Sequence, residues 1–224
     1  MGKLIVIEGL DGSGKSTQAP LLAEELRNQG RDVMLVSYPD YESNSSALVK
    51  MYLAGEFGEK PDDVNPYAAS SFYAVDRYAS YVKNWREFYQ KRDSIVIATR
   101  YTTSNEIHQL AKLDRDQWAD FIDWAEDYEY EKLGIPRPKA VLFLNMKQEI
   151  ALELIAKRSA ATGQAKDIHE IDMDYLDRCR RAATYASDRL GWIDILCYEG
   201  KEPLSQEEIT AKIFEEVTKV LDIK

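Results

Sequence analysis

Short apolar runs rich in β-branched residues recur along the chain, and helical periodicity separates most of them. Five such runs occur: Leu4 to Glu8, Val33 to Ser37, Ile95 to Ala98, Val141 to Leu144 and Ile193 to Cys197. Strands that alternate with helices form βαβ units, in which helices cover both faces of a parallel sheet. The pattern therefore predicts an α/β fold with a parallel five-stranded sheet flanked by helices.

The stretch between the second and third runs is too long for one crossover helix. We expect two or three helices there, including one across Pro66 to Arg92, and such insertions often form a substrate-binding lobe. The last helix begins at a capping box, Ser205 to Glu208, and continues with apolar residues at helical spacing. No linker or internal repeat divides the chain, so residues 1–224 are expected to form a single domain.

Composition narrows the class of protein. With 45% apolar and 30% charged residues, the chain is neither disordered nor collagen-like. Its 39 acidic and 29 basic residues give a formal net charge of −10, which would repel a nucleic acid backbone. No apolar run approaches the roughly 18 residues of a membrane span, and no signal peptide is recognisable. We therefore expect a cytoplasmic protein that binds neither nucleic acid nor membranes, with Cys179 and Cys197 as buried thiols.

The strongest local motif is a phosphate-binding loop between the first predicted strand and a predicted helix. It reads Gly9-Leu10-Asp11-Gly12-Ser13-Gly14-Lys15-Ser16-Thr17 and satisfies GxxxxGK[ST]. Its glycines let backbone N–H groups point at a triphosphate, and the following helix adds its positive dipole end. Lys15 would neutralise the outer phosphates, and the Ser16 hydroxyl would bind Mg²⁺. A chance glycine-rich turn is the alternative, but the flanking elements favour ATP binding and a three-layer P-loop NTPase fold.

The rest of the chain bears on which kind of NTPase this is. A hydrolytic motor or switch usually needs a Walker-B Asp after a second apolar strand, whereas the third and fourth predicted strands end in Thr99 and Asn145. The guanine-reading motif Asn-Lys-x-Asp is also absent from the sequence. The remaining interpretation is transfer of the γ-phosphoryl group to a small acceptor.

Further motifs resemble the thymidylate kinase family. They follow the loop in family order as Phe72-Tyr73-Ala74-Val75-Asp76-Arg77, Arg100-Tyr101-Thr102-Thr103-Ser104, Lys157-Arg158 and Asp167-Ile168-His169-Glu170. The resemblance spans nearly the whole chain. It implies an ATP- and Mg²⁺-dependent kinase that converts dTMP to dTDP for dTTP synthesis, with an acceptor-binding helical insertion over about residues 40–92 and a lid over about residues 157–168.

Two aromatic residues and an arginine are candidates for the acceptor-binding site. Tyr73 and Arg77 are four residues apart on a predicted helix and share one face. The resemblance implies that this pair stacks on thymine and hydrogen-bonds its carbonyl edge. The alternative is that Tyr73 packs in the core and Arg77 pairs with a nearby carboxylate. Tyr38, followed by Pro39, resembles the aromatic-Pro pair at the mouth of the family's acceptor site, although a Pro after a strand is also an ordinary turn.

Arg100 follows a predicted parallel strand, and ligands in such folds bind beyond the carboxyl ends of the strands. The resemblance implies that Arg100 contacts the phosphates being bridged, where it would offset developing charge. Ser104, Asn105 and His108 match positions near the base and sugar. The family commonly has Tyr at the position of His108, close to the sugar 2′ position, and a His that contacts no ligand is the alternative.

Asp11 and the lid complete the implied site. The family assigns the Asp11 carboxylate to the sugar hydroxyl of the acceptor. Because Gly12 rather than Arg follows it, the loop resembles the form in which basic lid residues approach the phosphates. The lid candidates are Lys157, Arg158 and Lys166, with Arg158 beside ATP as a catalytic residue together with Lys15 and Arg100. Asp167 and Glu170 match an acidic pair after the lid. The alternative for the lid cations is a solvated surface loop, and the alternative for Glu170 is that it only begins the next helix.

The chain departs from the family pattern at two positions. Thr99 replaces the Asp of the family's Asp-Arg-Tyr turn, which removes a carboxylate expected near Mg²⁺, and Tyr41 stands where some relatives place an Arg that clamps the acceptor phosphate. Two other interpretations therefore stay open, a weakly catalytic nucleotide-binding protein and a kinase for another (deoxy)nucleotide or deoxynucleoside. The resemblance also implies a homodimer.

Overall fold

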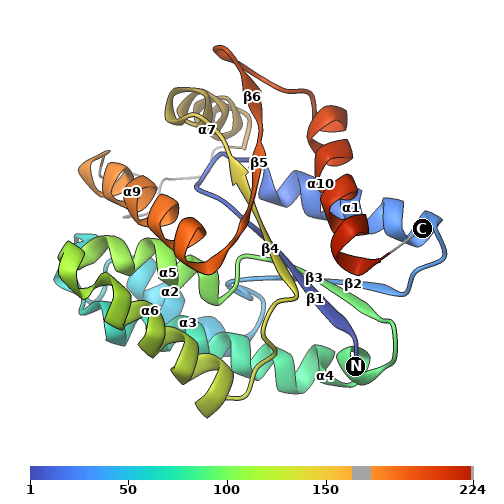
Figure 1. The fold of residues 1–224 in the computed structure, drawn as a ribbon. Coiled ribbons are helices and arrows are strands. Elements are labelled where there is room, and N and C mark those ends of the chain that lie inside the picture. The colour runs from blue at the N-terminus through green and yellow to red at the C-terminus, as the bar shows by residue number, and fades with distance from the viewer. Residues whose placement is uncertain (163–172, 223–224) are drawn as a thin grey trace.

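The computed structural model describes residues 1–162 and 173–222, with side chains everywhere in these ranges except residues 158–162. Its main sheet has five parallel strands in the order β2-β3-β1-β4-β5 (Figure 1). Each predicted run is a strand of this sheet, which confirms the fold class. The strands are β1 (Lys3–Glu8), β2 (Val33–Ser37), β3 (Ile95–Thr99), β4 (Ala140–Asn145) and β5 (Ile193–Leu196).

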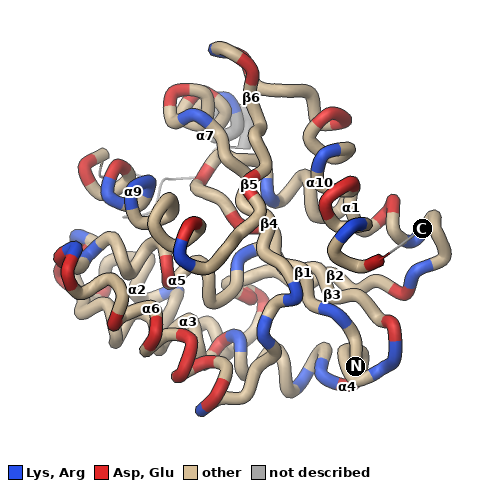
Figure 2. The backbone as a smooth tube through the Cα atoms, in the orientation of Figure 1, with Lys and Arg blue, Asp and Glu red and all other residues tan. Residues whose placement is uncertain are grey.

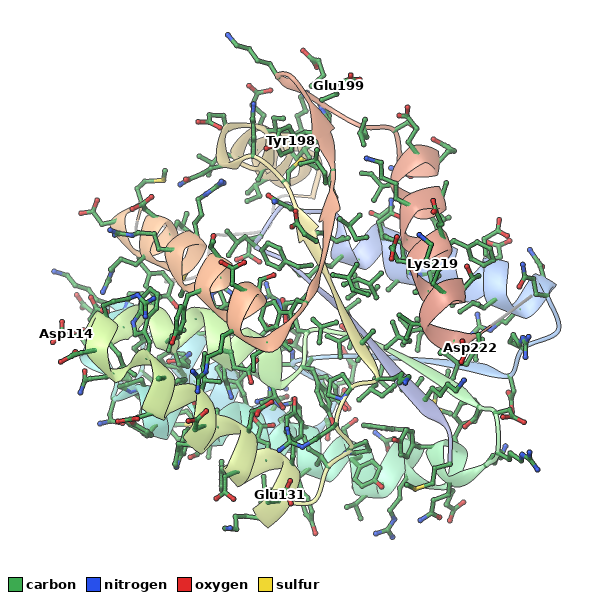
Figure 3. All side chains as sticks on the ribbon, in the orientation of Figure 1. Asp114, Glu131, Tyr198, Glu199, Lys219 and Asp222 are labelled. Carbon is green, nitrogen blue, oxygen red and sulfur yellow. The ribbon has the colours of Figure 1, made fainter. Side chains whose placement is uncertain are left out.

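Both faces of the sheet are covered, so alternate residues of each strand belong to different parts of the core. On β1, Leu4 and Val6 pack with the cluster around Trp85 and Phe121, whereas the residues between and after them, Ile5 and Ile7, pack with α1 and α10. Side chains fill the space on both faces (Figure 3). This two-sided burial explains why the strands read as continuous apolar runs instead of alternating ones.

The helices form the two outer layers (Figure 1). One face is covered by α1 (Lys15–Asn28) and α10 (Gln206–Leu221), and the other by α5 (Thr102–His108), α6 (Trp118–Glu126) and α9 (Met173–Leu190). The predicted capping box is confirmed, because Ser205 Oγ accepts from Glu208 N at 3.2 Å and Ser205 N donates to Glu208 Oε2 at 2.8 Å. The remaining elements include α7 (Gln148–Thr162), the π-helix at Asp127–Lys132 and the short hairpin of β6 (Tyr198–Glu199) and β7 (Glu202–Pro203).

The segment between β2 and β3 is helical, with α2 (Ala47–Leu53), α3 (Pro66–Ser80), a π-helical turn at Tyr81–Trp85 and α4 (Arg86–Gln90). Asn65 caps α3 by accepting hydrogen bonds from Tyr67 N and Ala68 N, and Pro66 occupies the first helical position. The π-helical turn ends at the fully buried Trp85, whose indole N–H donates to the Tyr38 hydroxyl at 2.9 Å. The helix predicted over Pro66 to Arg92 therefore begins at Pro66, as expected, and ends at Gln90, two residues before Arg92.

Acidic and basic residues are both present along α9, whereas α6 carries acidic residues and no basic ones (Figure 2). Within the described ranges, no helix has both the length and the apolar character needed to cross a membrane. Cys179 and Cys197 are free and buried, as predicted.

Candidate active site

The phosphate-binding loop connects β1 to α1 and brings a cation to the start of that helix. Gly14, at φ 95°, is the N-cap of α1, a conformation that favours glycine. The Lys15 ammonium donates to the carbonyls of Gly9 and Leu10 at 2.6 and 2.8 Å, so it lies over its own loop. Ser16 is exposed in the first turn of α1. The loop therefore combines a helix N-terminus, a positive charge and an accessible hydroxyl, which is the chemistry of a polyphosphate site.

A cleft of about 760 Å³ opens at the carboxyl ends of the strands, within the ~300–1,000 Å³ range of small-molecule sites. The position agrees with the general rule for open parallel sheets. Most of its lining comes from the phosphate-binding loop, from the ends of β2 and β3 with the residues that follow them, and from the segment that leads into the start of α10. Those residues are Asp11, Gly12, Ser13, Gly14, Lys15, Ser16, Thr17, Ser37, Tyr38, Tyr41, Thr99, Arg100, Pro203, Leu204, Ser205 and Gln206.

Arg100 reaches this cleft from the end of β3. Its backbone is left-handed, with φ 61°, and its N–H donates to the Ile7 carbonyl at 3.2 Å. The guanidinium forms an ion pair with Asp11, and its Nη1 lies 3.1 Å from His108 Nε2. Burial lowers the pKa of Arg100, but the carboxylates of Asp11 and Glu8 raise it by more, so the group is always charged. A fixed cation therefore stands beside the phosphate-binding loop.

Glu8 ties this loop to the start of α5. Its carboxylate is fully buried and accepts from Gly9 N at 2.9 Å, Thr103 Oγ1 at 2.6 Å and Ser104 Oγ at 2.8 Å. Three donors satisfy a charge that burial would otherwise make costly. The Ser104 hydroxyl, a predicted substrate contact, therefore has a partner inside the protein.

Arg77 is 1% exposed and pairs with Glu129, which is also 1% exposed. Arg77 Nε and Nη2 both donate to this carboxylate at 2.6 Å, and Thr102 Oγ1 and Asn105 Nδ2 donate to it at 3.0 and 3.2 Å. Burial lowers the pKa of Arg77, while the Glu129 charge and hydrogen bonds raise it by more. In the structure Arg77 therefore pairs with a carboxylate, which is the alternative to base binding given in the sequence analysis. A contact between Arg77 or Asn105 and a base stays a prediction.

The two candidate aromatic rings lie in different surroundings. Tyr73 is half-buried and packs edge-on against Tyr52, with ring centroids 6.3 Å apart. Tyr38 lines the cleft but is 4% exposed, and its hydroxyl contacts Ser80 and Trp85. Burial raises the pKa of Tyr38 to about 12, so this hydroxyl stays protonated. Stacking of Tyr73 on a base also stays a prediction.

The two departures from the family pattern both line the cleft. Thr99 Oγ1 donates to Ser37 Oγ at 2.7 Å, and the Tyr41 side chain is 50% exposed. Lys157 is exposed near the end of α7. The side chain of Arg158, the predicted lid residue Lys166 and the predicted acidic pair Asp167 and Glu170 lie outside the described residues.

Glu129 is the main residue that sequence reasoning missed. A signal for it exists, because Ile122, Ala125 and Glu129 follow the spacing of one helix face and the first two are buried. A charged carboxylate at the third position of such a face is costly to bury without a cation, and here Arg77 pairs with Glu129.

Comparisons with known proteins identify the family of this chain. The family model for thymidylate kinase matches residues 7–209. The thymidylate kinase of Mycobacterium tuberculosis is 32% identical over 185 residues, covering 82% of this chain and 84% of that protein. That of Caenorhabditis elegans is 32% identical over 166 residues, covering 68% and 66%. The structure of thymidylate kinase from Candida albicans shares the fold with a TM-score of 0.69 at 23% identity, covering 98% of this chain and 93% of that one. The chain thus belongs to the thymidylate kinase family.

Proposed function

We propose that this chain transfers the γ-phosphoryl group of ATP to the phosphate of dTMP, giving dTDP and ADP for dTTP synthesis. One structural observation supports the proposal most directly: Arg100 and the phosphate-binding loop line the same cleft. A kinase needs donor and acceptor phosphates close together, with cations around the group that moves. The similarity to thymidylate kinases over most of the chain supports dTMP as the acceptor.

In this reaction an oxygen of the acceptor phosphate forms a bond to the γ-phosphorus of ATP, and the bond to the β–γ bridging oxygen breaks. The N–H groups at the start of α1 would hold the donor phosphates, and Lys15 would leave the carbonyls of Gly9 and Leu10 to pair with them. Arg100 would stabilise the negative charge between donor and acceptor. Arg158 is proposed to approach the donor phosphates from the lid.

The acceptor would lie on the other side of Arg100. Asp11 would accept from its sugar hydroxyl while remaining paired with Arg100. The proposed base and sugar contacts are Tyr38, Tyr73, Arg77, Ser104, Asn105 and His108. Several of these already have partners in the protein, so base contacts would use their remaining donors or replace present ones.

Mg²⁺ is the implied metal, and the oxygen-rich chemistry of this cleft fits it. Ser16 is an exposed hydroxyl beside Lys15, and Asp11 and Thr99 supply further oxygens along the lining. Mg²⁺ prefers oxygen ligands and usually binds through few protein groups together with phosphates and waters. Ser16 would hold the ion, which when bound would neutralise phosphate charge. We also propose that the chain works as a cytoplasmic homodimer.

A coupled assay tests the proposal with purified protein, ATP and Mg²⁺ against dTMP, dUMP, dCMP, dGMP, UMP and thymidine. We expect dTMP to have the highest kcat/KM and thymidine to give no product. Faster phosphorylation of another monophosphate would overturn the proposal that dTMP is the substrate. The proposal that the chain is a nucleoside monophosphate kinase would still stand. Binding of ATP and dTMP without dTDP formation would support the weakly catalytic alternative instead.

Lys15→Met provides the control for contaminating kinases. It removes the loop cation, so dTDP formation should fall by roughly 10²-fold or more while the melting curve keeps its shape. Activity that survives this substitution unchanged would not belong to this site.

A further inference from the structure

Gln18 joins α1 to the first turn of α10 at the edge of the cleft. It lies one turn after Lys15 on the same face of α1, and it is 2% exposed. Its Nε2 donates to the Gln206 carbonyl at 3.1 Å, and its Oε1 accepts from Thr210 Oγ1 at 2.8 Å. Thr210 Oγ1 is also 2.8 Å from the Gln206 carbonyl. An amide, a hydroxyl and a carbonyl from two helices therefore form one closed cluster.

The hydrogen-bonding capacity of these groups fixes the orientation of the Gln18 amide. A carbonyl only accepts, so the Gln206 carbonyl has to face the NH₂ group of Gln18 and not its oxygen. The amide oxygen then faces Thr210, whose hydroxyl supplies the proton. Both ends of the amide are thus used. A hydrocarbon side chain of similar size could make neither contact, and a carboxylate could make only the one to Thr210.

The segment that Gln18 holds is a wall of the cleft. Residues 203–206 line the cleft together with the phosphate-binding loop. Near the start of this segment, Leu204 N donates at 3.0 Å to the carbonyl of Cys197, which directly follows β5. At its end, the Gln206 carbonyl is held by Gln18 on α1. The wall is therefore fixed to the sheet on one side and to the helix of the phosphate-binding loop on the other.

This part of the cleft is suited to the nucleoside of a phosphate donor. The donor phosphates would occupy the start of α1, and the wall adjoins that helix through Gln18. The lining there has an apolar character, because α7 supplies Leu154 and Ile155 and the region around the start of α10 supplies Leu204 and Ile209. A flat base can bury its faces against such side chains while its phosphates stay on the loop.

We infer that Gln18 is a positioning residue for the donor nucleoside, because through Gln206 and Thr210 it holds the wall at the spacing at which a nucleoside fits beside the phosphate-binding loop. The inference rests on the proposed function for the identity of the donor as ATP. The wall would contact the nucleoside and not the phosphates. Loss of the Gln18 amide should therefore weaken the binding of ATP and spare a ligand that consists of phosphates alone.

The first test compares two ligands by titration calorimetry in the presence of Mg²⁺, ATP and inorganic tripolyphosphate. Gln18→Leu keeps the approximate size of the side chain and removes both hydrogen bonds. We expect it to raise the Kd for ATP roughly tenfold, the scale of one or two hydrogen bonds, and to leave the Kd for tripolyphosphate within about twofold of wild type. Gln29→Leu is the matched control, because Gln29 is exposed at the far end of α1 and should change neither Kd.

The second test asks whether the cluster acts as a unit. Thr210→Val keeps the shape of the side chain and removes the hydroxyl, so it should raise the Kd for ATP in the same direction as Gln18→Leu. The double variant should bind ATP no more than about twofold less tightly than the weaker single variant, since the two groups share one network. In the coupled assay Gln18→Leu should raise KM for ATP roughly tenfold and leave KM for dTMP unchanged.

Two results would contradict the positioning role. Unchanged ATP binding in Gln18→Leu would show that the amide does not set the wall, and equal weakening of ATP and tripolyphosphate would assign Gln18 to the phosphate-binding loop instead. Thermal melting shows whether each variant folds, and Thr210→Val still decides between these results if Gln18→Leu does not. A wild type that binds ATP without forming dTDP would overturn the proposed function and leave the calorimetric result to stand. A wild type that does not bind ATP would overturn both.

Discussion

Glu106 is a carboxyl group in the core, 1% exposed. Neither of its oxygens has a hydrogen-bond partner among the residues that the structure describes. Burial raises its pKa well above the ordinary value, and the charges of Glu126, Glu129 and Glu8 raise it further. The folded protein therefore keeps a proton that the unfolded chain releases. Stability falls as pH rises from the ordinary pKa of 4.5 through the raised one.

Replacing this carboxyl by a neutral amide removes the pH-dependent cost. We expect Glu106→Gln to raise the free energy of unfolding at pH 8 by about 1–3 kcal/mol, with a smaller gain at pH 5.5. Urea denaturation at the two pH values measures it, with the exposed Glu59→Gln as control. A gain that is equal at both pH values would show that Glu106 does not titrate differently in the folded state.

The buried pair of Arg77 and Glu129 allows base binding to be separated from core stability. Arg77→Met leaves the Glu129 charge without its cation and should cost about 3–5 kcal/mol of stability. Arg77→Met with Glu129→Gln removes both charges and should recover most of that loss. If Arg77 also contacts the base, the stable double variant should show KM for dTMP raised about tenfold and KM for ATP unchanged. An unchanged KM for dTMP would leave Arg77 with the structural role alone.

At the residue scale, features that depend on a few consecutive residues could be predicted from the sequence. Features that join distant positions could not. The phosphate-binding loop is one contiguous motif, so its position after β1 could be predicted in full. The pairing of Arg77 with Glu129 joins positions 52 residues apart. Both residues lie on helices, and no short segment of the sequence determines how these two helices pack together. The sequence could therefore predict that Arg77 pairs with a carboxylate, but not that this carboxylate belongs to Glu129.

At the scale of elements, the phosphate-binding loop packs against α7, and two of its glycines differ in this respect. A Cβ on Gly12 would lie 2.6 Å from the Ala151 carbonyl, whereas a Cβ on Gly14 would meet nothing within 4 Å. Both have positive φ, 79° and 95°, so both alanine variants carry backbone strain. Only the Gly12 variant must also move α7.

Gly12→Ala should therefore destabilise the protein more than Gly14→Ala, by about 1–3 kcal/mol. Guanidinium denaturation of the two variants measures the difference, and the shared strain cancels in the comparison. Equal losses would mean that α7 adjusts without cost and does not constrain the loop.

The elements themselves were largely predictable, because strand composition and helix caps are properties of short segments. The run at Ile95 to Ala98 became β3 with one added residue, and Ser205 caps α10 as expected. The strand order β2-β3-β1-β4-β5 and the π-helical turn at Tyr81–Trp85 were not predicted. Both depend on packing between distant segments, and the π-helical turn ends at Trp85, which meets Tyr38 in the core.

At the scale of the whole molecule, an exposed apolar pair bears on assembly. Val75 and Tyr78 are three residues apart on α3, so they share a face, and they are 40% and 43% exposed. A second copy that covers this face would remove both side chains from water, which is the arrangement expected if the chain forms the proposed homodimer.

Val75→Glu should weaken that dimer, because the symmetric contact would bring two new carboxylates into an apolar interface. We expect roughly a 100-fold rise in the dimer dissociation constant, since opposed like charges cost several kcal/mol. Sedimentation velocity over a range of concentrations measures it. Leu196→Glu on β5 is the matched control, because Leu196 is also 43% exposed but lies on a different element. Equal weakening by both substitutions would point to a general effect of charge, and a dimer that resists Val75→Glu would place the contact elsewhere than on α3.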